Sequence, residues 1–160
     1  MVFVNHDNTC WKYYADDDHG SVPLISEYDA LREMFSWYRI KNLGQYFSPD
    51  ADFEPQEIID LFVTHYQKVS EHFGYEVLPA EQEINQFGYN FMQMKPEVSR
   101  AFFELNIKNY PDSPNVYDSM GDFYSAHGEN DKAIEMFEMA VEIGDYQVSK
   151  DKLDQLRAKE

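Results

Sequence analysis

Residues 117–143 read YDSMGDFYSAHGENDKAIEMFEMAVEI, and this stretch decides the fold of the 160-residue chain. Apolar residues recur with helical spacing on both sides of a central glycine, which suits a turn between two helices. Gly121 and Ala133 are small enough to let the two helices approach closely. Tyr124 and Phe137 are large enough to fill the space between neighbouring helix pairs. The stretch therefore predicts a helical hairpin that stacks against similar hairpins.

The same stretch resembles the tetratricopeptide repeat, a helix–turn–helix unit of about 34 residues. The matching residues, in chain order, are Tyr117, Met120, Gly121, Tyr124, Gly128, Ala133, Phe137 and Ala140. The resemblance implies an all-α fold in which hairpins stack into a right-handed superhelix. It also implies that the chain binds a protein or peptide on a concave face, or has a structural role, without chemistry of its own.

A second copy of the pattern lies upstream, so we expect repeats at about 80–112 and 114–146. Its matching residues are Phe87, Gly88, Phe91, Ser99, Phe103, Asn106 and Pro111. Gly88 precedes Gly121 by 33 residues, which implies a tightened turn at residues 95–96. Asn106 departs from the alanine usual at its position. Because two repeats are fewer than the usual three, we expect flanking helices to help close the core.

Local signals place the remaining elements. Pro55 and Gly74 predict a helix over 55–73 with an apolar stripe of Ile58, Ile59, Phe62, Tyr66, Val69 and Phe73. Further helices are expected over about 80–94, 97–109, 114–127, 130–143 and 149–158. Ser26 is the expected N-cap of an earlier helix whose apolar face carries Leu31, Met34, Phe35 and Tyr38. Residues 9–14 are the only strand candidate.

Composition excludes several classes of partner. Thirty acidic residues against 13 basic ones give a formal net charge of −17, which repels nucleic-acid phosphates and anionic lipid. We therefore expect neither a nucleic-acid nor a membrane partner, and no apolar run approaches the length of a membrane span. Cys10 is the only cysteine, so we expect no intrachain disulfide. No cofactor or metal site is predicted, and the sequence gives no localisation.

Residues 15–21, ADDDHGS, form a histidine loop. Together with the flanking residues 10–35, the loop resembles the C-terminal end of α/β-hydrolase esterases, in which a last strand, a His-Gly-Ser loop and a closing helix follow one another. The resemblance implies that His19 is a catalytic base, but only within a full-length hydrolase. Such a base needs a serine in a Gly-x-Ser-x-Gly elbow, which this chain lacks. Binding of a divalent cation by residues 16–19 and a plain exposed loop are the alternatives.

Combining these patterns, we expect three parts: a hydrolase remnant over 1–45, a linker over 46–54 and a helical-repeat domain over 55–160. We expect this acidic chain to bind a protein or peptide, or the missing hydrolase domain. The alternative function is that the full-length parent is a serine carboxylesterase, to which the chain supplies His19. Candidate groove residues are Asn85, Asn90, Gln93, Arg100 and Asp122. The apolar segment 3–14 could also pair with a second copy of the chain.

Overall fold

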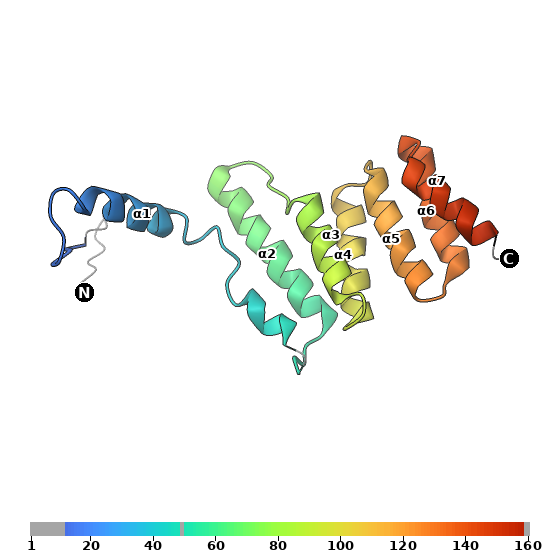
Figure 1. Cartoon of the computed structure of the whole chain (residues 1–160), viewed down its shortest axis with the longest axis horizontal. Coiled ribbons are helices and arrows are strands. Elements are labelled where there is room, and N and C mark those ends of the chain that lie inside the picture. The colour runs from blue at the N-terminus through green and yellow to red at the C-terminus, as the bar shows by residue number, and fades with distance from the viewer. Residues whose placement is uncertain (1–11, 49, 159–160) are drawn as a thin grey trace. The chain divides into compact units, whose positions relative to one another are not determined.

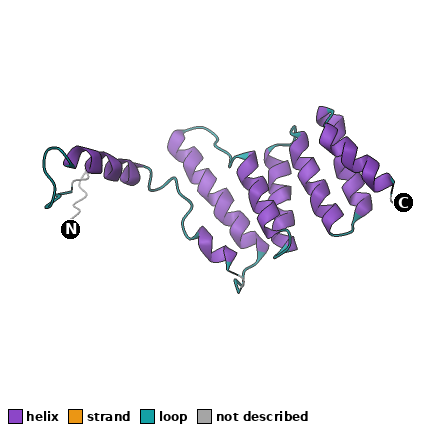
Figure 2. Ribbon diagram, in the orientation of Figure 1, coloured by secondary structure: helices purple, strands orange, loops and turns teal. Residues whose placement is uncertain are grey.

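The computed structural model describes residues 12–48 and 50–158, and every regular element within them is helical (Figures 1 and 2). This confirms the predicted all-α class. Contacts along the chain divide it into two compact units, Met1–Lys41 and Asn42–Glu160. Of the predicted strand over 9–14, residues 12–14 are described and adopt neither strand nor helix, while residues 9–11 lie outside the described part.

The first unit contains helix α1, Val22–Met34. The helix begins before the expected Ser26, because the preceding turn is closed by side-chain hydrogen bonds and Pro23 lies in the first helical turn. The N-cap prediction for Ser26 is therefore wrong, and the Ser26 hydroxyl instead donates to the Pro23 carbonyl at 3.0 Å. The expected apolar face is present in sequence, but α1 buries no residue.

The second unit begins with a short 3-10 helix, η1 (Leu43–Phe47), and helix α2 (Pro55–Phe73). The predicted bounds of α2 are confirmed, and Gly74 ends the helix with a φ of 74°, a conformation that glycine adopts without strain. Four residues of its predicted apolar stripe are buried: Ile58, Ile59, Phe62 and Val69. Tyr66 is half-buried, and Phe73 is 43% exposed, so the stripe ends before the last helical turn.

Residues 46–54 were expected to be a linker, but they belong to the second unit, where Phe47 and Phe53 contact its helical core. The ring of Phe47 stacks on that of Phe91, with centroids 5.0 Å apart, and the Phe53 ring meets Phe91 edge-on at 6.3 Å. Aromatic residues in this stretch therefore attach it to the helical core. The division between the units accordingly falls after Lys41, earlier than the expected boundary at residue 45.

Two hairpins and a final helix follow α2, and consecutive helices pack side by side from α3 to α7 (Figure 1). They are α3 (Glu81–Phe91), α4 (Pro96–Asn109), α5 (Pro114–Ala126), α6 (Asn130–Gly144) and α7 (Gln147–Arg157). The predicted bounds differ from these by a few residues. The third helix stops at Phe91 because the chain turns there, and the Lys95 amide donates to the Phe91 carbonyl.

The two hairpins use the same contact where their helices cross. A Cβ atom added to Gly88 would lie 2.5 Å from ring carbon Cε1 of Phe103. A Cβ atom added to Gly121 would lie 2.4 Å from the equivalent carbon of Phe137. In both hairpins the first helix therefore presents bare backbone to an aromatic ring of the second helix. The glycines leave no room for a side chain at either crossing.

Polar residues at two small-residue positions of the first hairpin are both buried and both hydrogen-bonded. The Ser99 hydroxyl donates to the Gly88 carbonyl at 2.7 Å. The Asn106 side-chain amide donates to the Glu81 carbonyl at 3.1 Å, which ties the second helix of the hairpin to the start of the first. Asn106 therefore replaces the usual alanine with a contact that holds the hairpin together.

Candidate binding site

A polar cavity of about 830 Å³ lies against helix α3, next to the end of α4 and the start of α5. It is lined by Ala80, Glu81, Gln82, Asn85, Gln86, Tyr89, Tyr110 and Asn115. Its walls are held in place by hydrogen bonds between helices. The Asn115 amide donates to the Glu81 carboxylate at 2.7 Å, and the Tyr110 hydroxyl donates to the Pro79 carbonyl at 2.8 Å. Contacts between helices therefore define the shape of the cavity.

Asn85 is the unusual residue of this cavity. Its carbonyl oxygen, Oδ1, is buried and accepts no hydrogen bond from the residues that the structure describes, a state it shares with Oδ1 of Asn106 outside the cavity. A buried acceptor without a partner costs roughly 1–3 kcal/mol, so a partner that donates a hydrogen bond would be favoured there. The neighbouring lining residues are also rich in amides and phenols, which bind by hydrogen bonds rather than by proton transfer. The cavity is suited to hold a ligand through hydrogen bonds.

A hydrogen-bonded chain of side chains links α3, α5 and α7 beside the cavity. The Tyr89 hydroxyl donates to the Asp122 carboxylate at 2.8 Å. The Lys152 ammonium lies 2.7 Å from carboxylate oxygens of both Asp122 and Asp118. The Ser149 hydroxyl completes the chain by donating to Asp118 at 2.6 Å. These contacts hold the three helices together by charge-assisted bonds.

The surroundings of Lys152 and Tyr89 raise the pKa of both side chains. Burial opposes the charging of Lys152, but the hydrogen bonds and charges of Asp118 and Asp122 outweigh it and raise the pKa of the ammonium. Burial, with the charge of Asp122, raises the pKa of the Tyr89 hydroxyl far above its usual value, although a hydrogen bond from Ser119 opposes this. Both groups therefore keep their protons at neutral pH. Neither can act as a general base there.

The structure scatters the five groove residues predicted from sequence. Asn85 lines the cavity, and Asp122 reaches its edge through Tyr89. Asn90 is exposed and accepts a hydrogen bond from Gln86, while Gln93 is exposed in the turn after α3. Arg100 is exposed on α4, where its guanidinium lies 3.4 Å from Glu104.

Sequence reasoning missed Tyr89, Tyr110 and Asn115, which line the cavity. The sequence did contain one indication that Tyr89 lies next to Asp122. It precedes Asp122 by 33 residues, the spacing of Gly88 and Gly121, so the two residues occupy equivalent places on equivalent helices. Side chains at such places lie next to each other when hairpins stack.

His19 lies in an exposed turn and makes no hydrogen bond to a residue that the structure describes. The carboxylates near it are used to close the turn. Asp18 accepts from the Gly20 amide at 2.7 Å, and Asp17 accepts from the Ser21 hydroxyl at 2.8 Å. No acid among the described residues therefore orients the imidazole. Among residues 12–48 and 50–158, no group of three His, Cys, Asp or Glu side chains could hold a metal ion.

None of the helices in the described residues is both long and apolar enough to cross a bilayer. In comparisons with known proteins, the sequence matches no family model, and no curated protein and no solved structure matches the chain.

Proposed function

We propose that residues 42–160 form a tetratricopeptide-like domain that binds a segment of a protein partner and has no catalytic activity of its own. The repeated contact between glycine and aromatic ring supports this assignment. It occurs at Gly88 and at Gly121, one sequence repeat apart, in two hairpins that pack side by side. Stacked hairpins of this kind offer an extended surface for other proteins.

The observation that carries the proposal is the polar cavity whose lining includes Asn85, a residue with a buried oxygen that has no partner among the described residues. A peptide main chain supplies an N–H donor at almost every residue, and these donors suit such an acceptor. Tyr89 and the amides of Gln82 and Gln86 line the same cavity and could bind other polar groups of the peptide. An extended segment of a protein partner therefore fits the chemistry of the cavity.

The test is a screen of an array of synthetic peptides, followed by affinity measurements on the peptides that bind. Asn85→Ala should weaken these peptides roughly tenfold, because it removes the acceptor of a buried hydrogen bond. Asn90→Ala is the matched control, since Asn90 lies on the same helix but is exposed outside the cavity. Equal losses in both variants, or no loss in Asn85→Ala, would contradict the proposed site.

As a second candidate, we propose that the first unit supplies His19 as the catalytic base of a serine carboxylesterase. The observation that favours it is that α1 has no buried residue and exposes large apolar side chains, as expected of a closing helix separated from its domain. The most exposed of these residues are Leu24, Tyr28, Leu31 and Met34.

This candidate is tested in a protein in which a domain with a Gly-x-Ser-x-Gly elbow precedes the chain. His19→Ala should abolish hydrolysis of a p-nitrophenyl ester by that protein, while His127→Ala, in the second unit, should not. The chain alone should show no turnover, because it has no elbow serine. Full activity of the His19→Ala protein would exclude His19 as the base.

A further inference from the structure

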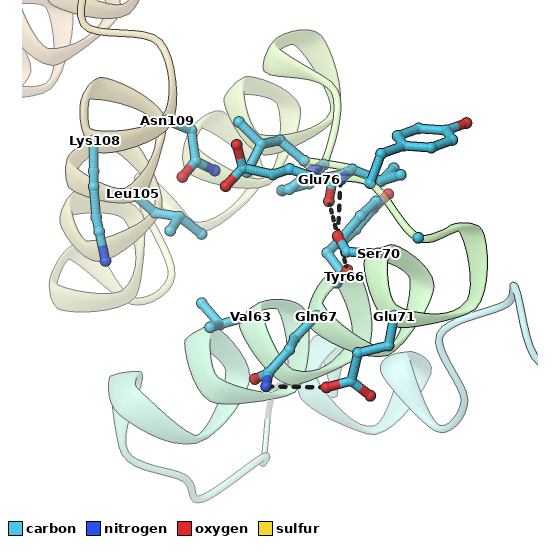
Figure 3. Close-up of a pocket in the computed structure, with 14 residues that line it drawn as sticks. Val63, Tyr66, Gln67, Ser70, Glu71, Glu76, Leu105, Lys108 and Asn109 are labelled. Atoms are coloured by element: carbon cyan, nitrogen blue, oxygen red, sulfur yellow. Dashed lines mark hydrogen bonds between the residues drawn. The ribbon is translucent and has the colours of Figure 1, made fainter.

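A second cavity, of about 620 Å³, lies between the C-terminal halves of α2 and α4 (Figure 3). Its walls are residues of α2, the connection over 74–79 and the end of α4. It shares no lining residue with the Asn85 cavity. Its volume falls within the roughly 300–1,000 Å³ typical of ligand sites. The cavity is therefore large enough to accept a substantial part of a ligand.

The middle of this cavity is apolar. Val63 of α2 and Leu105 of α4 project into it from opposite sides (Figure 3). Leu78 of the connection also lines the cavity. Val63 is 44% exposed and Leu78 is 37% exposed, whereas Leu105 is nearly buried. An apolar side chain inserted between them would remove this surface from water, which is favourable.

The connection that forms one wall is held rigidly. The Ser70 hydroxyl accepts a hydrogen bond from the Val77 amide at 2.8 Å and lies 3.2 Å from the Val77 carbonyl oxygen. Pro79 is buried, and its carbonyl accepts from the Tyr110 hydroxyl. A wall fixed at two points needs little ordering when a ligand binds, which lowers the entropic cost of binding.

The same wall has free hydrogen-bonding groups. The main-chain groups of Glu76 and Leu78 make no hydrogen bond to any residue within the described part of the chain. Between them, the Val77 amide donates to the Ser70 hydroxyl, which lies 2.8 Å from the Tyr66 carbonyl oxygen and 3.2 Å from that of Val77. An extended peptide could pair with the free groups, as peptides do when they add to the edge of a sheet.

The charged residues at the rim of this cavity favour a ligand of one charge over the other. Glu71 and Glu76 line the cavity and are exposed, and neither forms an ion pair with a cation of the described chain. Lys108 is the only cationic lining residue, and the whole chain has a net charge of −17. The rim therefore favours a cationic ligand over an anionic one such as a fatty acid.

From these observations we propose that the cavity between α2 and α4 binds a basic peptide segment, with one large aliphatic side chain between Val63 and Leu105. A basic side chain of the same segment pairs with Glu71 or Glu76. The site is additional to the one at Asn85, so its ligand and its test are independent of that proposal.

The test uses the full chain with isotope-labelled valine and leucine methyl groups, titrated with synthetic peptides and followed by NMR. The probe is acetyl-Gly-Arg-Leu-Arg-Gly-amide. There are two control peptides. In the first, Leu is replaced by Ala; in the second, both Arg residues are replaced by Glu. The probe should saturate the chain and shift the methyl signals of Val63, Leu78 and Leu105. Each control peptide should bind roughly tenfold more weakly, as expected from losing one buried side chain or the complementary charge.

Variants of the chain test whether the probe peptide binds in this cavity. Val63→Arg and Glu76→Lys should each weaken the probe roughly tenfold, since both residues are exposed and their replacement leaves the core intact. Thr64→Arg and Glu135→Lys are the matched controls, because they make the same changes of charge at exposed positions that do not line the cavity. Asn85→Ala should leave the shifts unchanged, which separates this site from the first.

Three results would overturn the proposal. The first is equal affinity for the leucine and alanine peptides, which would indicate attraction by net charge alone. The second is an equal loss of binding in the control variants. The third is the absence of saturable shifts at Val63, Leu78 and Leu105.

Discussion

At the scale of single residues, the hairpins depend on two glycines whose lack of a side chain is structural. Both lie in helices, where glycine costs about 1 kcal/mol relative to alanine. Glycine is nevertheless required at both positions, because an aromatic ring occupies the space that a Cβ atom would need. Gly44 offers a contrast, since nothing lies within 4 Å of its Cβ position.

We therefore predict that Gly121→Val lowers the free energy of unfolding by about 2–3 kcal/mol, because the added methyl groups must displace the Phe137 ring. Gly44→Val should change it by less than about 0.5 kcal/mol. Urea unfolding followed by circular dichroism measures both values. Equal effects of the two substitutions would show that the close approach at Gly121 is not what requires glycine.

At the scale of helices, α7 is held to the rest of the domain by apolar packing and by the Lys152 ammonium. Leu153 and Leu156 pack against Phe137, and Lys152 lies between the carboxylates of Asp118 and Asp122. The pKa of Lys152 is higher in the folded chain than the ordinary lysine value of 10.5, which approximates the unfolded chain. Its contribution to stability is therefore complete below about pH 10.5 and is lost as the pH rises through the folded pKa.

The corresponding variant is Lys152→Met, which should cost about 2 kcal/mol at pH 7, since it leaves Asp118 buried without its cation. The difference in stability between wild type and variant should shrink above about pH 10.5. Lys150→Met is the control, because Lys150 lies on the same helix and pairs with the exposed Asp145. Thermal unfolding across this pH range provides the measurement, and a pH-independent difference would exclude the ion pair as the cause.

Helix α1 differs from the others because it has no buried residue over its 13 positions. An isolated helix of about 12–15 residues is marginal in water. We therefore predict that backbone amides of α1 exchange with solvent far faster than those of α5, as measured by hydrogen–deuterium exchange. Exchange of α1 as slow as that of α5 would instead indicate that a second copy or a partner covers its apolar side chains.

Some elements could be predicted from the sequence and others could not. The difference is whether an element depends on neighbouring residues or on residues far apart in the chain. The bounds of α2 follow from Pro55 and Gly74, which act on the backbone next to them. The packing of residues 46–54 depends on Phe47 meeting Phe91, residues far apart in the chain, and local pattern could not indicate it.

The two cavities could not be predicted from the sequence for a related reason. Both lie between elements, so their volume depends on how far apart α2, α3, α4 and α5 stand. Helical periodicity predicts which face of a helix is buried, but not where two buried faces fail to meet. Asn85 was therefore expected in a groove, whereas the unpartnered state of its oxygen became visible only in the structure.

At the scale of the whole molecule, the buried core belongs to one of the two units. The buried apolar side chains among the described residues begin at Ile58 and end at Leu156. All of them lie within Asn42–Glu160. Because burial of apolar surface is the main favourable term in folding, the second unit contains what it needs to fold by itself.

We predict that a fragment spanning residues 42–160 keeps the unfolding temperature and the cooperativity of the full chain. The rings of Phe47 and Phe53 must be included, because both contact Phe91. A shorter fragment starting at residue 55, the predicted domain boundary, should lose about 1–3 kcal/mol, as expected when aromatic contacts are removed. Thermal unfolding of the full chain and of the two fragments measures these differences in stability. If both fragments were as stable as the full chain, residues 46–54 would be the linker predicted from sequence, and their aromatic contacts would add nothing to the fold.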